Sequence, residues 1–446
     1  MQELFVAAVY VFYLFLGFMA PFVAGLGYIW VDIFTPQNVA PHVLGDFPVA
    51  LVLGLACFAG YTLFDRRERP HIGLPLLLIL AFAGWMSLTQ LWAVAPDAAE
   101  KWTWAFKVMI FAAFTPFLFR SRVQIEAALL TIIFALSSTV LAVAAKTLVT
   151  GGGYGAREAL VGANSGLAEG STLSMVAVAI LPLVTFVSRY SLILAAPRRL
   201  VSVACRGFSA CCVVTAVGLF TRTGLVALGV YVVLAWWQSR HKIVIGAAVA
   251  AGILVLLPLM GTVWEDRMST IENPESDPSA AGRLAVWQWT LSYVAEHPLG
   301  GGFNVYEFDK VELPSTTGVP RTVTGVAFHS IYFEILGEMG IVGLAVWASL
   351  IAAFFIGLVR LRRQARQYEE GEWLVGLTTA LASSVVIYLV GGAFIGVGFQ
   401  PTLYYLIGIA IAAQEYWRRS GKATGVTLRG RRPRGLPSAG ATPEAA

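Results

Sequence analysis

The chain has 446 residues, of which 57% are hydrophobic and 13% are charged, and its mean hydropathy is +0.73. Because soluble domains carry about 25% charged residues, this composition excludes an ordinary soluble protein and predicts a polytopic membrane protein. The formal net charge is +5. We assign it to cytoplasmic loops, where membrane proteins concentrate Lys and Arg, and we expect no nucleic-acid partner.

The N-terminus and the cysteines exclude two further classes. The first residues lack a basic region and run directly into apolar sequence, so we expect no cleavable signal peptide. No His, Asp and Glu cluster has the spacing of metal ligands, and we expect neither a metal nor another cofactor. The four cysteines lie in or beside apolar segments and predict neither a disulfide framework nor a zinc site: Cys57, Cys205, Cys211 and Cys212.

Apolar runs follow one another along most of the chain. They predict an all-α fold, a transmembrane helix bundle of about 12 or 13 spans. The first two runs are short, which favours a helical hairpin or a pair of half-helices. The runs cover residues 4–19, 21–34, 47–64, 73–94, 103–119, 125–149, 171–189, 207–221, 222–238, 243–260, 331–359, 374–397 and 402–417.

Basic residues predict the orientation of this bundle. They cluster in alternate loops, and such loops stay in the cytoplasm. The intervening loops, including the long one over residues 261–328, then face outward. The clusters lie at residues 66–69, 120–122, 189–206, 240–242 and 360–366, and in the tail after residue 417.

The long polar insertion divides the chain. An amphipathic helix is predicted between Ser279 and Pro298, with an apolar face that lies against the outer end of the bundle. That face is formed by Leu284, Trp287, Leu291 and Val294. The predicted parts are a transmembrane bundle over 1–260, an outward loop region over 261–330, transmembrane helices over 331–417 and a disordered basic cytoplasmic tail over 418–446.

Arg222 ends one apolar run and begins the next. A charge costs about 2.5–3.5 kcal/mol at the centre of a membrane helix and less at its boundary. One interpretation is an arginine that snorkels to the interface. Because the predicted topology places Arg222 outside, where positive charge is not favoured, an anion site fits this residue better.

Arg283 opens the amphipathic helix and borders its apolar face. It either pairs with a neighbouring carboxylate such as Asp277, a surface contact of little value, or points toward the bundle. Arginine binds phosphate oxygens in a bidentate manner, so Arg222 and Arg283 together are suited to hold a diphosphate.

His329 stands where the polar insertion re-enters the membrane. The helix that follows carries Tyr332 and Phe333 on nearly the same face. A lone histidine is more often structural than catalytic, but neutral imidazole is the best general base near pH 7. Glu334 and Glu338 sit well round the helix from His329, so neither is an obvious orienting partner.

Weaker candidates lie elsewhere on the outward side. Arg157, Asn164 and Glu169 belong to the loop over residues 151–170. Asn164 either hydrogen-bonds a sugar or phosphate or caps a re-entrant turn. Lys101 and Lys107 lie near the outer end of their span.

Several motifs resemble the O-antigen ligase/O-antigen polymerase superfamily of bacterial membrane glycosyltransferases. They are R-x3-W at residues 283–287, P-L-G-x-G-F at 298–303 and H-S-x-Y-F-E-x-L-G-E-x-G-x-x-G-L at 329–344. The segment T-R-T-G-L-V-A-L around Arg222 is similar to a further motif, with Thr221 in place of the more usual Ser. The segments YIWVDIFTPQNV and WEDRMSTIENPESDPSAAGR resemble the O-glycosylation ligases found with exosortase systems.

This resemblance implies an inverting, metal-independent glycosyl transfer at the periplasmic face of a bacterial inner membrane, with the C-terminus in the cytoplasm. The donor would be a glycan on undecaprenyl diphosphate, moved en bloc to a hydroxyl of a glycan, lipid or protein acceptor. Arg222 and Arg283 would neutralise the leaving diphosphate, and His329 would deprotonate or orient the acceptor. Further substrate contacts would come from Asn164, Arg157, Tyr332 and Glu334.

Two alternatives stay open. A polymerase of the same superfamily would join repeat units into a ladder of lengths. A transporter of a lipid-linked sugar would need ionisable groups in mid-span and usually internal repeats, and the sequence favours neither feature.

Overall fold

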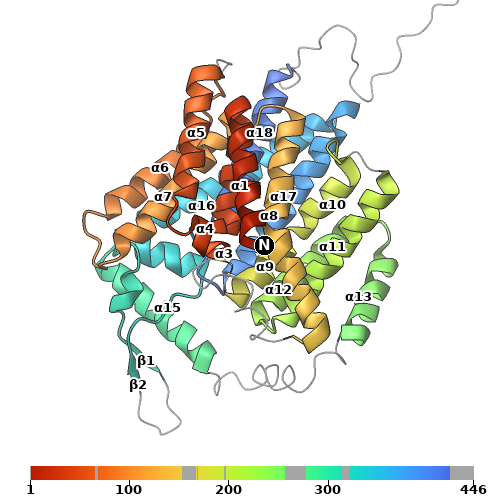
Figure 1. Cartoon of the computed structure of the whole chain (residues 1–446). Helices are drawn as coiled ribbons and strands as arrows, with labels where there is room; N and C mark the ends of the chain where they lie inside the picture. The colour runs from red at the N-terminus through yellow and green to blue at the C-terminus, as the bar shows by residue number, and fades with distance from the viewer. Residues whose placement is uncertain are drawn as a thin grey trace, which may run out of the picture.

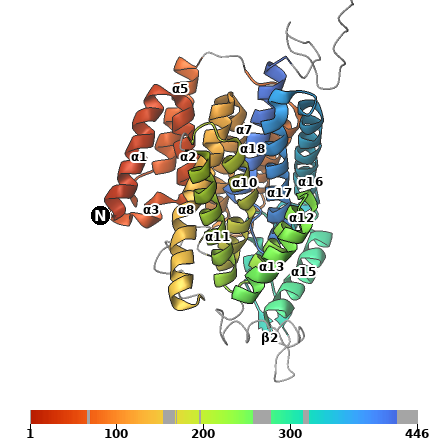
Figure 2. The same cartoon turned by 90° about the vertical axis from the view of Figure 1, so that its right-hand side faces the viewer.

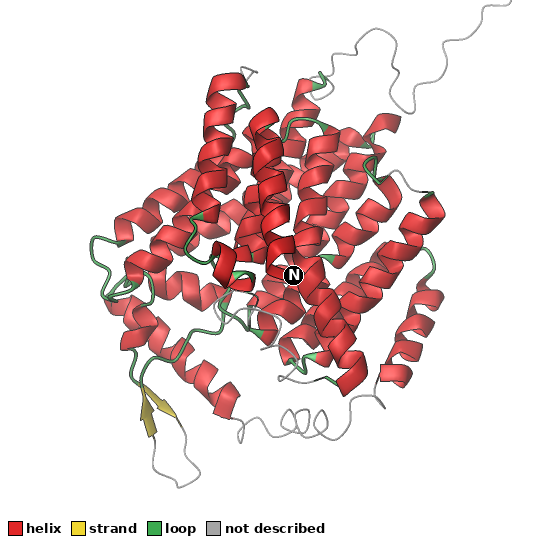
Figure 3. Ribbon diagram, viewed as in Figure 1, coloured by secondary structure: helices red, strands yellow, loops and turns green. Residues whose placement is uncertain are grey.

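The computed structural model describes residues 2–65, 69–152, 167, 169–194, 197–256, 278–313 and 321–421. Helices stand side by side in a bundle and account for most of these residues (Figures 1 and 3). In chain order they are α1 (Gln2–Met19), α2 (Pro21–Phe34), α3 (Pro36–Val39), α4 (Pro41–Leu44), α5 (Val49–Phe64), α6 (Leu74–Thr89), α7 (Ala98–Leu118), α8 (Arg122–Thr150), α9 (Gly170–Ala179), α10 (Leu181–Tyr190), α11 (Arg198–Gly218), α12 (Arg222–Gln238), α13 (Lys242–Leu256), α15 (Pro278–Glu296), α16 (Ile331–Ala365), α17 (Glu372–Gly392) and α18 (Pro401–Arg419).

Length and composition identify the helices that can cross a membrane. Among the described residues, six helical segments are long and apolar enough, and α2, α5 and α6 are shorter apolar helices. The chain is therefore an all-α, multi-pass membrane protein, as its composition predicts. The number of crossings and the division into four parts stay predictions. The six segments are Gln2–Met19, Arg122–Thr150, Gly170–Tyr190, Arg198–Gly218, Ile331–Ala365 and Glu369–Gly392.

The first two helices form a tight antiparallel hairpin. Only Ala20, in an extended conformation, separates α1 from α2, and Pro21 opens α2. A Cβ on Gly17 would lie 2.7 Å from Ala24 Cβ, and one on Gly27 would lie 2.7 Å from Tyr13 Cβ. The two helices thus pack side by side along their length, which confirms the hairpin alternative for the first two short runs.

Several helices extend beyond the apolar runs that predict them. α11 begins at Arg198, nine residues before its predicted start, and α16 continues to Ala365 through Arg360, Arg362 and Arg363. Arginine is a good helix former, so the backbone stays helical after the apolar pattern has ended. Hydropathy therefore predicts the apolar part of each helix better than its ends.

Helix α18 lies largely inside the bundle. Every residue from Pro401 to Ala413 is buried, and the helix packs against α7, α8, α16 and α17. A helix that is apolar all round belongs at the centre of a bundle. Figure 2 shows α1 and α5 on one flank and α15 and α16 on the other.

The two ends of the bundle differ. At one end lie α15 and a hairpin of β1 (Val311–Leu313) and β2 (Arg321–Val323), which pair antiparallel with Val311 opposite Val323 (Figure 1). The short turn η4 (Val305–Phe308) leads into the hairpin. Helix α18 ends at the opposite end of the bundle. The hairpin is an addition to the predicted all-α fold, at residues too few and too polar to show alternation.

The apolar face predicted for α15 is only partly right. Val294 is buried, but Leu284 and Leu291 are 57% and 56% exposed. The buried stripe instead joins Val294 to three residues at four-residue spacing, because α15 packs along α16 and β1 and not only on the outer end of the bundle. These residues are Gly282, Val286 and Thr290.

Candidate functional site

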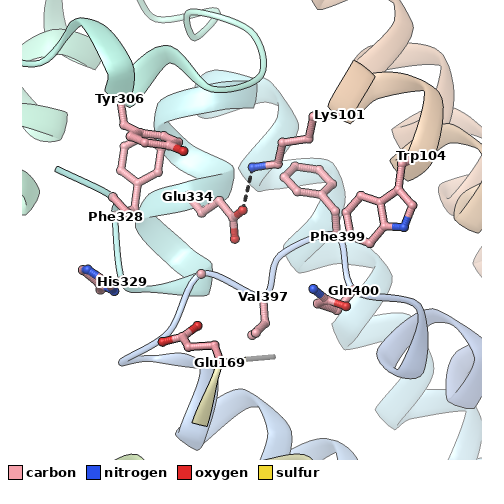
Figure 4. A pocket seen from close by; sticks show the side chains of 12 residues that line it. Lys101, Trp104, Glu169, Tyr306, Phe328, His329, Glu334, Val397, Phe399 and Gln400 are labelled. Atoms are coloured by element: carbon pink, nitrogen blue, oxygen red, sulfur yellow. Dashed lines mark hydrogen bonds and ion pairs between the residues drawn. The ribbon is translucent and has the colours of Figure 1, made fainter. Parts of the chain in front are cut away.

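A cavity of about 260 Å³ lies where α7, α9, α16 and two loops converge (Figure 4). Its walls combine aromatic rings with ionisable groups, a mixture typical of a binding site. The lining residues are Lys101, Trp104, Glu169, Tyr306, Ala327, Phe328, His329, Glu334, Gly396, Val397, Phe399 and Gln400. Four residues named as candidates from the sequence are therefore in one pocket: Lys101, Glu169, His329 and Glu334.

Tertiary contacts on both sides hold His329 in place. Its backbone has φ +47°, a left-handed conformation that non-glycine residues seldom adopt, and Ser330 then begins α16. On the preceding residue, the carbonyl of Phe328 accepts a hydrogen bond of 2.8 Å from Trp287 Nε1. The Trp287 ring also stacks on Phe333 at 4.9 Å between centroids. Helix α15 therefore fixes the entry to α16 and orients His329.

Arg283 lies one helical turn before Trp287, which brings its charge to His329. Burial lowers the pKa of His329 below 6.5, the nearby Arg283 lowers this pKa further, and Glu169 opposes both by raising it. The imidazole is therefore neutral at pH 7 and able to accept a proton. Arg283 itself does not line the cavity.

Arg222 opens α12 at the end that packs on α9. Thr221 caps this helix: its Oγ1 accepts a 3.2 Å hydrogen bond from Gly224 N and donates to Ser174 Oγ at 2.9 Å. Ser174 belongs to α9, and Glu169 is the residue immediately before that helix. Arg222 thus follows a residue bonded to α9, and it does not line the cavity.

A buried ionic cluster forms the opposite wall. Lys101 Nζ lies 2.8 Å from Glu334 Oε1 and 2.8 Å from Glu338 Oε1. The side chains are 18%, 9% and 0% exposed, in that order. The backbone N–H of Gly398 donates to Glu334 Oε2 at 2.7 Å, and that of Asn304 donates to Glu338 Oε1 at 3.0 Å. The Lys101 ammonium therefore joins α7 to α16, and the two glutamates join α16 to the loops that carry Asn304 and Gly398.

The structure shows a role for Lys101 and Glu338 that the sequence did not predict, as partners in a buried ion pair. Lys101 is only a weaker candidate there, and Glu338 is no obvious partner of His329. Two signals pointed to the pairing: a lysine in an apolar segment needs a partner, and Glu334 and Glu338 share a helix face at i, i+4 spacing. Neither signal identifies the partner, which is more than 230 residues away along the chain.

The P-L-G-G-G segment docks into a break in α16. Gly340 has φ +67° and ψ −169° inside this helix. Here Ile341 N donates to Pro298 O at 2.9 Å, and Gly301 N donates to Gly337 O at 3.0 Å. A Cβ on Gly340 would stand 2.3 Å from the carbonyl carbon of Leu299. A side chain does not fit where the two segments cross, which explains why Gly300 and Gly340 meet there.

The remaining residues predicted from the sequence lie elsewhere. Tyr332 is on α16, but its hydroxyl donates to Leu389 O at 3.1 Å and its ring packs edge-on to Trp347, so it does not line the cavity. Arg157 and Asn164 fall outside the described residues. Within the part of the chain that the structure describes, no group of three His, Cys, Asp or Glu side chains is arranged to hold a metal ion.

Together, the fold and the site define a multi-pass membrane protein with a polar, aromatic-lined pocket at one end of its helical bundle. Comparison with family models is consistent with this class: residues 207–348 match the O-antigen ligase family, and residues 1–192 match a family of unknown function (DUF5935). The match over residues 207–348 supports membership of the O-antigen ligase superfamily, a group of glycosyltransferase-like enzymes with lipid-linked glycan and acceptor partners.

The two matches cover different parts of the site, and the pocket residues at 396–400 lie outside both. Arg222, Arg283, His329 and both glutamates of the ionic cluster fall in the O-antigen ligase match, and Lys101 falls in the other. A search of curated proteins gave no match. The resemblance to exosortase-associated ligases stays a prediction.

Proposed function

We propose that this protein transfers a glycan from undecaprenyl diphosphate to an acceptor hydroxyl in the pocket around His329. The reaction takes place at the periplasmic face of a bacterial inner membrane. Within the ligase or polymerase role of the superfamily, we assign en bloc ligation to a lipid, protein or polysaccharide acceptor.

The observation that carries this proposal is the position of His329. It lines the cavity, its pKa is lowered first by burial and then by Arg283, and Trp287 contacts Phe328 before it and Phe333 after it. A neutral, oriented imidazole is what a general base for a sugar hydroxyl requires.

The chemistry is a single displacement with inversion. The acceptor hydroxyl gives its proton to the neutral imidazole as its oxygen bonds to the anomeric carbon of the donor. The bond from that carbon to the diphosphate oxygen breaks in the same step, and the diphosphate leaves with the electron pair. Charge therefore grows on the diphosphate in the transition state, where preorganised cations lower the barrier most.

Arg222 and Arg283 are the cations that we assign to this charge. Arg222 is the first residue of α12 and follows Thr221, which hydrogen-bonds Ser174 of α9, and Arg283 lies in the second turn of α15 and lowers the pKa of His329. Guanidinium groups bind phosphate oxygens in a bidentate manner, so the two side chains supply the charge stabilisation without a metal ion.

The ends of the bundle support the orientation. Arg198 and Arg199, Arg362 and Arg363, and Arg418 and Arg419 occupy the ends of helices that lie away from α15. By the rule that basic loops stay inside, the end with α15 and the pocket faces the periplasm and the C-terminus is cytoplasmic.

The test is a glycan profile in membranes supplied with an oligosaccharide on undecaprenyl diphosphate and a candidate acceptor, with EDTA present. We expect one discrete shift of the acceptor, lost in His329→Ala and kept in His297→Ala, because His297 is exposed at the end of α15. A ladder of lengths would make the protein a polymerase. A donor that changes leaflet and stays intact would make it a transporter and refute the proposal.

A further inference from the structure

The pocket carries more negative than positive charge. Its one lysine, Lys101, is shared by the carboxylates of Glu334 and Glu338. Its remaining carboxylate belongs to Glu169, which precedes α9 on the other side of the cavity. Among the described residues Glu169 forms no ion pair, and its Oε2 accepts a 3.1 Å hydrogen bond from Thr172 Oγ1.

Glu169 is directed into the cavity. Figure 4 shows its carboxylate pointing toward His329, across the pocket from the contact between Lys101 and Glu334. A ligand that reaches His329 therefore passes a carboxylate on each side. The arginines that can offset this charge do not line the cavity, although Arg283 acts on His329 from α15.

Aromatic rings supply the other walls. Trp104, Tyr306, Phe328 and Phe399 line the pocket, and Tyr306 packs edge-on against Phe328 at 5.7 Å. The face of an aromatic ring is electron-rich, so it attracts C–H groups and cations and repels anions. The apolar C–H face of a sugar ring fits such a wall, while its hydroxyls fit carboxylate and amide groups such as Glu169 and Gln400.

We propose that this pocket binds a sugar ring that is uncharged or carries an amino group and excludes an anionic sugar, and that Glu169 sets this choice. The proposal rests on the proposed function, in which a sugar hydroxyl must reach His329. The cavity of about 260 Å³ takes a group of monosaccharide size. The ring can belong to the acceptor or to the donor glycan, since both present the same chemistry.

Direct binding tests the choice without any transfer reaction. The protein in nanodiscs is titrated with methyl β-D-glucopyranoside, its 2-amino-2-deoxy analogue and its uronate, and saturation-transfer difference NMR gives each affinity. We expect the uronate to bind about tenfold or more weakly than the other two, the effect of one repulsive charge pair near the protein surface, where Glu169 is exposed. Equal affinity for uronate and glucoside, or no binding of any of the three, would overturn the proposal.

Two pocket variants and one control variant show whether Glu169 causes the weak binding of the uronate. Glu169→Gln is expected to restore uronate binding to within about threefold of glucoside binding, and Glu307→Gln, an exposed carboxylate beside the pocket residue Tyr306, to change neither. Gln400→Lys adds a cation to the lining and is expected to favour the uronate even if the Glu169 variant is unstable. Uronate exclusion that survives both pocket variants would contradict the role of Glu169.

Transfer kinetics then show whether the bound sugar ring belongs to the acceptor or to the donor glycan. If the glucoside competes with the acceptor, the pocket is an acceptor subsite, and if it competes with the lipid-linked glycan it is a donor subsite. Selective sugar binding with no transfer from any lipid-linked donor would support the subsite and contradict the proposed function, so the two failures are distinguishable.

Discussion

Replacing Lys101 with methionine removes the one cation from the buried cluster with Glu334 and Glu338. Methionine keeps the length and packing of the side chain but leaves two carboxylates, 9% and 0% exposed, without their counter-charge. Removing one partner of a buried ion pair costs about 3–5 kcal/mol. A carboxylate can instead take up a proton, which at pH 7 costs about 1.4 kcal/mol for each pH unit above the ordinary glutamic acid value of about 4.3, or about 4 kcal/mol.

Both routes give the same magnitude. We therefore expect Lys101→Met to destabilise the protein by about 4 kcal/mol at pH 7. Because the second route binds protons, the loss should shrink as the pH falls toward 5. The pocket should also loosen, since Glu334 holds Gly398 N and Glu338 holds Asn304 N.

Chemical denaturation in mixed micelles at pH 7 and pH 5 measures this effect. Lys310→Met, at an exposed lysine outside the cluster, is the control and should change the stability by less than about 0.5 kcal/mol. The double variant Lys101→Met with Glu338→Gln should recover part of the loss, because one buried charge is gone. A Lys101→Met protein as stable as the wild type at pH 7 would refute the reasoning.

Two further predictions concern the histidine and the break in α16. Because the charge of Arg283 lowers the pKa of His329, Arg283→Ala should raise this pKa. Protonation of the base then begins at higher pH, so the acid limb of the pH–rate profile should move upward, and a limb that stays in place would argue against the coupling. Gly340→Ala should cost about 1–3 kcal/mol from its backbone conformation, and more from the contact with Leu299, so an unchanged melting curve would show that the segment does not dock as described.

The sequence predicted well those features that depend on neighbouring residues in the chain. Apolar runs predicted the order of the helices, since burial in lipid demands about 20 apolar residues whatever surrounds them. The sequence also favoured an Arg283 that points toward the bundle, and in the structure its charge lies near enough to His329 to lower the pKa of that residue. The short first runs likewise indicated the hairpin of α1 and α2.

What depends on packing was not predictable. The partners of Lys101 lie on α16, and periodicity contains no information on which of many helices faces another. The buried stripe of α15 was mistaken because Val286 and Thr290 are smaller than Leu284 and Leu291, and close helix packing prefers the smaller residues. Tyr332 was expected beside His329, yet the backbone turns at His329 before α16 begins, so the spacing of a continuous helix does not relate the two side chains.

The central claim is that His329 accepts the proton in a transfer that releases undecaprenyl diphosphate. The most direct measurement compares wild type with His329→Asn, since asparagine tolerates the left-handed backbone and is not a base. We expect the wild type to release one diphosphate lipid for each new glycosidic bond, with inverted anomeric configuration, and the folded variant to be slower by about 10²–10⁴. A variant that transfers at nearly the wild-type rate, or a product with retained configuration, would contradict the account.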